Sequence, residues 1–328
     1  MNHSAFEQAW ALPLNGPAES LAEGDCTTAM AGERPFVVLL NRNADDIATF
    51  LIKNALVPDV LLKPLLMEDT RPRCEAINEG VLLNLRGMNL NPGAELGEML
   101  SARMWITDKF IVIMHAHKIM ALAEIIQNFK DGHGPVSIGD FIVTFADRLT
   151  ERMMPEVQQI EEQIDTLEEQ LDDDDAFTVD NGHLRNELAR IRPGITALKR
   201  FIAPQKDALA RLSILSAPWL TDVDRINLRH IVDIVTRLVE DLETLRERSA
   251  LIKDAIQQKM SDAMAHSMNW LSAVAFVFLP LGFLTGLLGI NVGGMPGAET
   301  TWAFWCVCAL MLVLGVGLWA FMRKKKLL

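Results

Sequence analysis

The side chains in this sequence that could bind a metal ion are spread along the chain. His115 and His117 lie two positions apart on a β-type run, so both could face one side of a strand, although no third ligand can be assigned. His133 lies in a turn and is expected to be solvated. His266 lies on a long predicted helix and could titrate near neutral pH. No zinc-finger spacing, phosphate-binding loop or catalytic triad is present, so we expect neither an enzyme nor a bound cofactor.

The most informative polar residue is Asn291, in the stretch GLLGINVGGMPG (286–297). An asparagine amide oxygen can hydrogen-bond the water shell of a hydrated cation without trapping the ion, whereas a carboxylate would hold it tightly. Gly289, Gly293 and Gly294 allow backbone conformations that let the chain turn at this place. Asparagine is also a common helix C-cap, so the residue alone leaves a structural and a functional role open.

Two apolar runs flank this stretch, and each is long enough to cross a membrane. Residues 270–290 and 302–322 would each measure about 31 Å as a helix, and the hydrocarbon core of a bilayer is about 30 Å thick. Glu299 is the one charge between Trp270 and Met322. We therefore predict two transmembrane helices.

The flanks of these runs predict how the chain is oriented. Four basic residues at 323–326 favour a cytoplasmic tail over 323–328, and a helical hairpin then leaves the N-terminal part on the same side. The N-terminus shows no signal peptide, which agrees with this orientation. We expect a multi-pass membrane protein, with both termini in the cytoplasm and with residues 291–301 as the outer loop.

A stripe of polar and small residues runs along one face of the predicted first span. It begins at Asp254, and spacings that alternate between four and three residues keep its members on one helix face. Towards and within the span its members are Met268, Ser272, Ala275, Leu279, Gly282 and Gly286. Such a face could line an axis where copies of the chain meet, or it could only allow close helix packing. In a closed oligomer, Asp254 and the loop residue Glu299 would each form a carboxylate ring that binds or attracts cations.

The N-terminal part predicts a cytoplasmic α+β domain over residues 1–145. Short β-type runs at 36–40 and 75–87 alternate with amphipathic segments, and the run 102–116 is broken by a turn at 107–109. The formal net charge of −12 argues against a nucleic-acid partner.

Apolar residues spaced by three and four predict a coiled-coil helical hairpin over residues 146–218. The acidic run at 172–175 lies at its tip and could bind cations or could simply be solvated. Pro193 and Pro204 are expected to interrupt and kink the second helix. A stalk helix over 219–269, capped at Thr221 or Asp222, would then run unbroken into the first span.

This layout, with Gly289-Ile290-Asn291 at the end of the first of two terminal spans, resembles the CorA superfamily of divalent-cation transporters. The family hallmark is Gly-Met-Asn, and Ile290 replaces its methionine here. The stretch GINVGG-x-PG is similar to the zinc-transporting ZntB branch and departs from the Met-Pro-Glu of the magnesium branch. The resemblance implies a funnel-shaped homopentamer in which five first spans line the pore and Asn291 meets the hydrated ion.

The resemblance implies zinc transport across the bacterial inner membrane, with proton coupling as a further expectation. Co²⁺, Ni²⁺, Cd²⁺ and Mg²⁺ are other ions that could be carried. The alternative within the family is a magnesium, cobalt or nickel channel. From another class of proteins, the alternative is a membrane-anchored scaffold or metal sensor. Besides other copies of the chain, the expected partners are membrane lipids and divalent cations.

Overall fold

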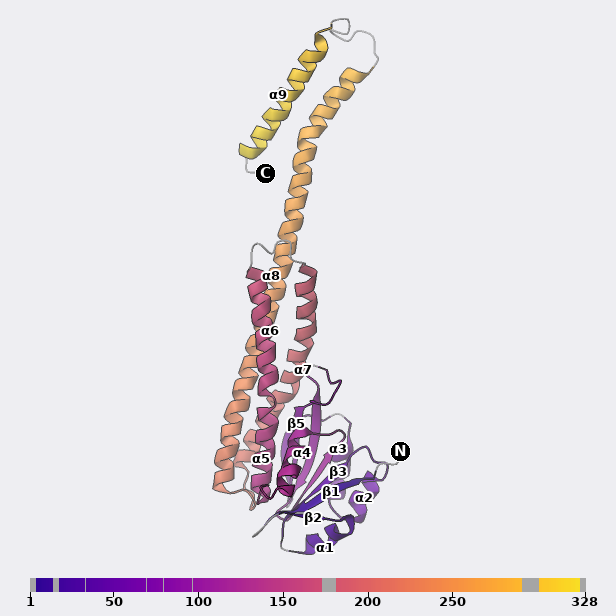
Figure 1. Cartoon of the computed structure of the whole chain (residues 1–328), viewed down its shortest axis with the longest axis vertical. Coiled ribbons are helices and arrows are strands. Elements are labelled where there is room, and N and C mark those ends of the chain that lie inside the picture. Colours follow the sequence, from indigo (N-terminus) through magenta and orange to yellow (C-terminus); the bar gives the residue numbers. More distant parts are fainter. Residues whose placement is uncertain are drawn as a thin grey trace. The chain divides into compact units, whose positions relative to one another are not determined.

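The computed structural model describes residues 4–13, 18–32, 34–68, 70–78, 80–95, 97–172, 181–290 and 301–324. Figure 1 shows the whole chain, which divides into two compact units, Met1–Ile252 and Lys253–Leu328. The long helix α8 (Asp222–Gly289) begins in the first unit and ends in the second.

The first unit is built on a mixed seven-stranded sheet with the order β2-β1-β3-β7-β6-β5-β4. The strands are β1 (Phe6–Ala11), β2 (Glu19–Leu21), β3 (Phe36–Asn41), β4 (Arg73–Ile77), β5 (Gly80–Met88), β6 (Met99–Ile106) and β7 (Phe110–His115). β3 and β7 are parallel, and the other neighbours are antiparallel. The three β-type runs of the sequence thus form strands, and the predicted turn at 107–109 joins β6 to β7. β7 is buried along its whole length, and its residues before His115 are all apolar, as is typical of a strand covered on both faces.

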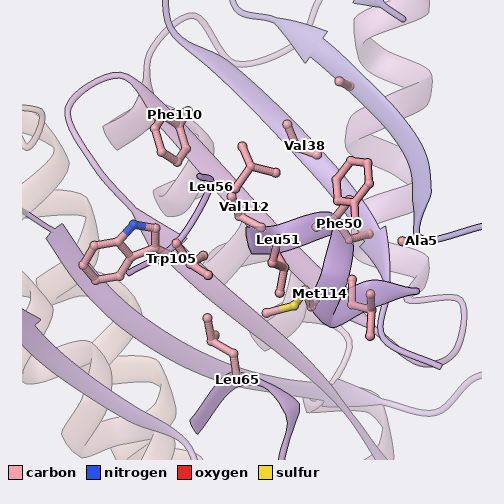
Figure 2. Packing of buried hydrophobic residues seen from close by; sticks show 14 of the residues in the cluster. Ala5, Val38, Phe50, Leu51, Leu56, Leu65, Trp105, Phe110, Val112 and Met114 are labelled. Atoms are coloured by element: carbon pink, nitrogen blue, oxygen red, sulfur yellow. The ribbon is translucent and has the colours of Figure 1, made fainter. Parts of the chain in front are cut away.

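Helices cover both faces of this sheet. They are η1 (Glu23–Asp25), α1 (Cys26–Ala31), α2 (Ile47–Lys53), α3 (Asp59–Leu66), α4 (Met120–Lys130) and α5 (Ile138–Glu151). Figure 2 shows the core on one face, where Phe50 and Leu51 of α2 and Leu65 of α3 pack towards Val112 and Met114 of β7. On the other face, Phe129 of α4 stacks on Trp10 of β1 at 5.7 Å between ring centroids.

Two further helices, α6 (Met154–Asp172) and α7 (Asn181–Ile214), form the predicted hairpin. Their stripes of Val, Leu and Ile are buried, which explains why a sequence with strong polar faces folds as paired helices. The expected interruption at Pro193 and Pro204 is wrong, because α7 continues through both prolines. α7 also packs against β5, where the Gln205 side-chain oxygen accepts a 2.6 Å hydrogen bond from the amide of Arg86. Residues 173–175 of the acidic tip lie outside the described residues.

The start of α8 is fixed by a reciprocal capping interaction. The Thr221 hydroxyl accepts a hydrogen bond from the Asp224 amide at 3.2 Å, and the Asp224 carboxylate accepts one from the Thr221 amide at 2.9 Å. This pairing satisfies donors that the first helical turn leaves free. The predicted single long helix is confirmed, since α8 has 68 residues without a break.

The second unit contains the remainder of α8 and α9 (Ala303–Lys324), which are the two predicted spans. Their most apolar 18-residue windows have mean hydropathies of 2.2 and 2.3. Only 6% and 0% of these windows are buried within the chain, so neither apolar window is packed as the core of a soluble domain. Leu279, Phe283, Trp305 and Leu312 are among the large apolar side chains left exposed. Surfaces of this kind are stable in hydrocarbon or against other copies of the chain.

Candidate functional site

The stripe of polar and small residues on α8 is not covered by any other part of the single chain that the structure describes. Every member is exposed, from Asp254 through Gln258, Ser261, Ala265, Met268, Ser272, Ala275, Leu279 and Gly282 to Gly286. A Cβ built on Gly282 or Gly286 would have no neighbour within 4 Å. The glycines are therefore not needed for packing inside one chain, and the face is free to meet other copies or water.

The far end of the stripe leads to the Gly-Ile-Asn motif. Gly289 is the last residue of α8, and Ile290 follows it with its side chain 50% exposed. Asn291 and Glu299 lie outside the described residues, so their roles stay predictions. Near this end, the Thr285 hydroxyl donates to the carbonyl oxygens of Leu281 and Gly282 at 3.1 and 3.0 Å, which uses its hydrogen within the helix.

The side of α8 that faces α9 overlaps the stripe at Ser272. A cavity of about 220 Å³ lies between the two helices. It is lined by Asn269, Ser272, Ala273, Phe276, Phe321 and Met322. At Gly315 of α9, a Cβ would lie 3.6 Å from Leu281 of α8, which is ordinary van der Waals contact. The two helices thus pack through small residues, as helices do in a bilayer.

Contrary to expectation, His115 and His117 do not share a strand. His115 is the last residue of β7 and only 8% exposed, whereas His117 lies beyond the strand and is exposed. Both line one cavity of about 280 Å³, together with Glu7 of β1. Glu7 could not be singled out from its residue type or spacing, because its approach to His115 depends on the pairing of β1 with β3. His133 and His266 are exposed.

Some acidic side chains of the first unit form ion pairs between helices. The guanidinium group of Arg248 on α8 binds Glu168 and Asp165 on α6, and these hydrogen bonds raise its pKa above the usual range. Arg248 therefore holds α6 to α8 at any physiological pH. Among the described residues, no three His, Cys, Asp or Glu side chains are arranged to hold one metal ion.

Arg103 is a buried cation with a structural role that the sequence did not indicate. Arg103 of β6 is 1% exposed and donates to the carbonyl oxygens of Leu65 at 2.7 Å and Glu68 at 2.9 Å. These oxygens belong to the last turn of α3 and the chain just after it, where carbonyl groups lack partners within the helix. Arg103 thus caps α3 from the sheet.

Comparison with known proteins agrees with this architecture. The chain is 33% identical over 326 residues to the zinc transport protein ZntB of Pectobacterium atrosepticum, covering 99% of this chain and 97% of the relative. The structure of the full-length CmaX protein superposes with a TM-score of 0.83 at 27% identity, over 99% of both chains. The complete CorA magnesium transporter of Methanocaldococcus jannaschii has the same fold, with a TM-score of 0.80 at 19% identity over 97% of both chains.

The family assignment follows from the extent of the match. The model of the family described as CorA-like Mg²⁺ transporter protein matches residues 37–324, which include most of the first unit and both apolar helices. The fold, the two exposed apolar helices and the relatives all lead to one conclusion. The chain belongs to the CorA family of divalent-cation transporters and is not an enzyme.

Proposed function

We propose that this chain carries zinc across the bacterial inner membrane as a homopentamer, with the stripe of α8 lining the path of the ion. The observation that supports this most is the continuous exposure of the stripe from Asp254 to Gly286. Relatives named as zinc transport proteins, 33% identical over almost the whole chain, favour zinc as the ion.

The need for several copies follows from the number of spans. Two helices cannot enclose a water-filled path, and backbone polar groups in a bilayer must be satisfied within helices or closed barrels. A ring of chains gives each α8 stripe an axis to face, while the apolar sides of α8 and α9 contact neighbours or lipid. A pentamer is the arrangement that the family resemblance implies.

The end of α9 supports an orientation with both termini in the cytoplasm. Arg323 and Lys324 end the helix, and the guanidinium group of Arg323 lies 5.6 Å from the ring centre of Trp319. Basic side chains at the end of a span are typical of the cytoplasmic side, and tryptophan is common at both membrane interfaces.

At the outer mouth we propose that five Asn291 amides hydrogen-bond the water shell of the entering ion. Neutral oxygens recruit a hydrated cation without the tight binding that carboxylates would give. Asn291→Ala should therefore abolish zinc uptake into proteoliposomes and leave assembly and thermal stability almost unchanged. Asn269→Ala is the matched control, because Asn269 lines the cavity between α8 and α9 and lies outside the stripe. Normal uptake by the Asn291 variant would refute the proposal.

Transport of magnesium is the second candidate, because the family model is described by that ion. It predicts magnesium flux without zinc flux in the same liposomes. A membrane-anchored scaffold or sensor would need no closed ring of chains. The mass of the particle in detergent, with five chains expected, distinguishes that reading from a pore.

A further inference from the structure

We propose a zinc-binding site inside the first unit, formed by the Nε2 atom of His115 and the carboxylate of Glu7. The site lies in the cavity of about 280 Å³ at the carboxyl end of β7. It is separate from the stripe of α8, and the inference does not rest on the proposed transport function.

The two side chains are brought together by a β-bulge. Phe6 pairs with Leu40 and Gln8 with Leu39, so Glu7 is the extra residue on β1. A bulge changes the direction in which a side chain points. In this case it places a Glu7 carboxylate oxygen 3.1 Å from His115 Nε2, although β3 lies between β1 and β7 in the sheet.

His115 itself is held firmly. It pairs with Asn41 of β3 in the sheet, and its carbonyl oxygen accepts a 2.9 Å hydrogen bond from the Arg42 amide. The Nε2 atom is buried, and no described residue gives it a hydrogen bond of good geometry. Glu7 lies close to Nε2 but forms no hydrogen bond with it, because its carboxylate lies to the side of the Nε2–H direction. A buried polar nitrogen without a hydrogen bond is costly, and an absent ligand is one explanation for it.

A zinc ion fits these two atoms. Imidazole nitrogen and carboxylate oxygen are common zinc ligands, with bonds of about 2.0–2.2 Å, and two ligands at tetrahedral angles then lie about 3.3 Å apart. The cavity leaves room for water molecules, each of which occupies about 30 Å³ in the liquid. Water would complete the coordination, because His117 lines the cavity without joining the other two in a three-residue group.

The remaining charge in the cavity comes from Lys118. Its side chain is exposed, so the ammonium group can stay in water while the metal binds deeper in the cavity. With two protein ligands the site should bind zinc more weakly than a closed structural site does. Weak binding suits a site that fills only when the zinc concentration rises.

The test is calorimetric titration of the full-length, tag-free protein with ZnCl₂ in detergent at pH 7. An Asp254→Asn, Asn291→Ala, Glu299→Gln background removes the side chains that would bind cations along the proposed pore. We expect one zinc per chain in this background, and a dissociation constant at least tenfold weaker after His115→Gln or Glu7→Gln. His133→Gln is the matched control, since His133 is exposed in a turn, and it should bind zinc like the background.

Unchanged zinc affinity in either variant would overturn the inference. If His115→Gln fails to fold, Glu7→Gln decides alone, because the Glu7 side chain is 35% exposed and its replacement is tolerated more easily. Thermal unfolding without metal checks that each variant is folded. Uptake by the chain without these substitutions is measured separately, so failure of this site and failure of zinc transport are distinguishable.

Discussion

At the scale of single residues, Cys74 shows how burial alters chemistry. It lies on β4 and is 4% exposed, and burial raises the pKa of its thiol from 9.0 to about 11, with Arg211 opposing the shift and Glu75 adding to it. Two units of pKa reduce the thiolate fraction at pH 8 by about a hundredfold. Since the thiolate is the nucleophile, Cys74 should react with iodoacetamide at least tenfold more slowly in the folded protein than in urea. Peptide mass spectrometry measures this, and equal rates would contradict it.

Asp254 carries the second prediction at this scale. Five copies of this exposed carboxylate near an axis would repel one another unless a cation neutralised them. A bound ion stabilises the assembly by RT ln(1 + [L]/Kd) for each independent site. Asp254→Asn should therefore remove much of the gain in melting temperature that zinc gives. Asp241→Asn is the control, because Asp241 is exposed on α8 away from the stripe. An equal response of wild type and Asp254→Asn to zinc would show that no such ring binds the ion.

Residue spacing in the sequence is enough to predict some sites but not others. The stripe of α8 could be predicted because the helical period alone decides which residues share a face. The pairing of Glu7 with His115 could not, because it depends on a bulge in β1 and on strand order. The capping role of Arg103 could not be predicted for a similar reason, since its partners are carbonyl groups near the end of a helix that is distant in the sequence.

At the scale of elements, the junction of α5 with the start of α8 depends on Gly139. A Cβ at this position would lie 2.3 Å from a carboxylate oxygen of Asp224 and 2.7 Å from the carbonyl oxygen of Trp219. Asp224 is the acidic member of the capping interaction of α8 and is 7% exposed, so it has little room to move. The close approach of the two helix starts therefore requires glycine.

Gly139→Ala should lower the melting temperature by several degrees, equivalent to about 1–3 kcal/mol of overpacking. Gly24→Ala is the matched control, because a Cβ there meets nothing within 4 Å. Thermal unfolding followed by circular dichroism compares the two variants. A Gly139 variant as stable as the control would mean that α5 and α8 can separate without cost.

Elements were predictable where a local pattern decides them. The runs that became β3, β5, β6 and β7 are rich in β-branched and apolar residues, so their strands were expected. The order of the sheet was not, because pairing between strands distant in sequence leaves no local mark. For the prolines of α7, by contrast, a local pattern predicted an interruption that the helix does not have. Each removes one helical hydrogen bond, and the buried stripe on both sides holds the helix together nevertheless.

At the scale of the whole molecule, membrane insertion follows from exposure rather than from composition alone. A buried helix of a soluble protein can be as apolar as α9, but none of the apolar window of α9 is buried within its own chain. The acidic net charge of −12 comes entirely from the residues before the first apolar run, since residues 270–328 carry one acidic and four basic side chains. Because the chain belongs to the CorA family, the two exposed helices are interpreted as the membrane part of a transporter.

The proposed zinc selectivity leads to the last prediction. Magnesium holds its waters tightly in octahedral geometry, whereas zinc accepts lower coordination numbers. A mouth of neutral amides that handles hydrated ions should discriminate weakly, so we expect zinc uptake into proteoliposomes with Co²⁺, Ni²⁺ and Cd²⁺ as competitors and with Mg²⁺ carried less well. An inward proton gradient should speed uptake if zinc and protons move together. Robust magnesium flux without zinc flux would contradict the zinc assignment. Zinc flux that ignores the proton gradient would keep the metal and discard the coupling, because the ion's own gradient and the membrane potential would then be the driving force.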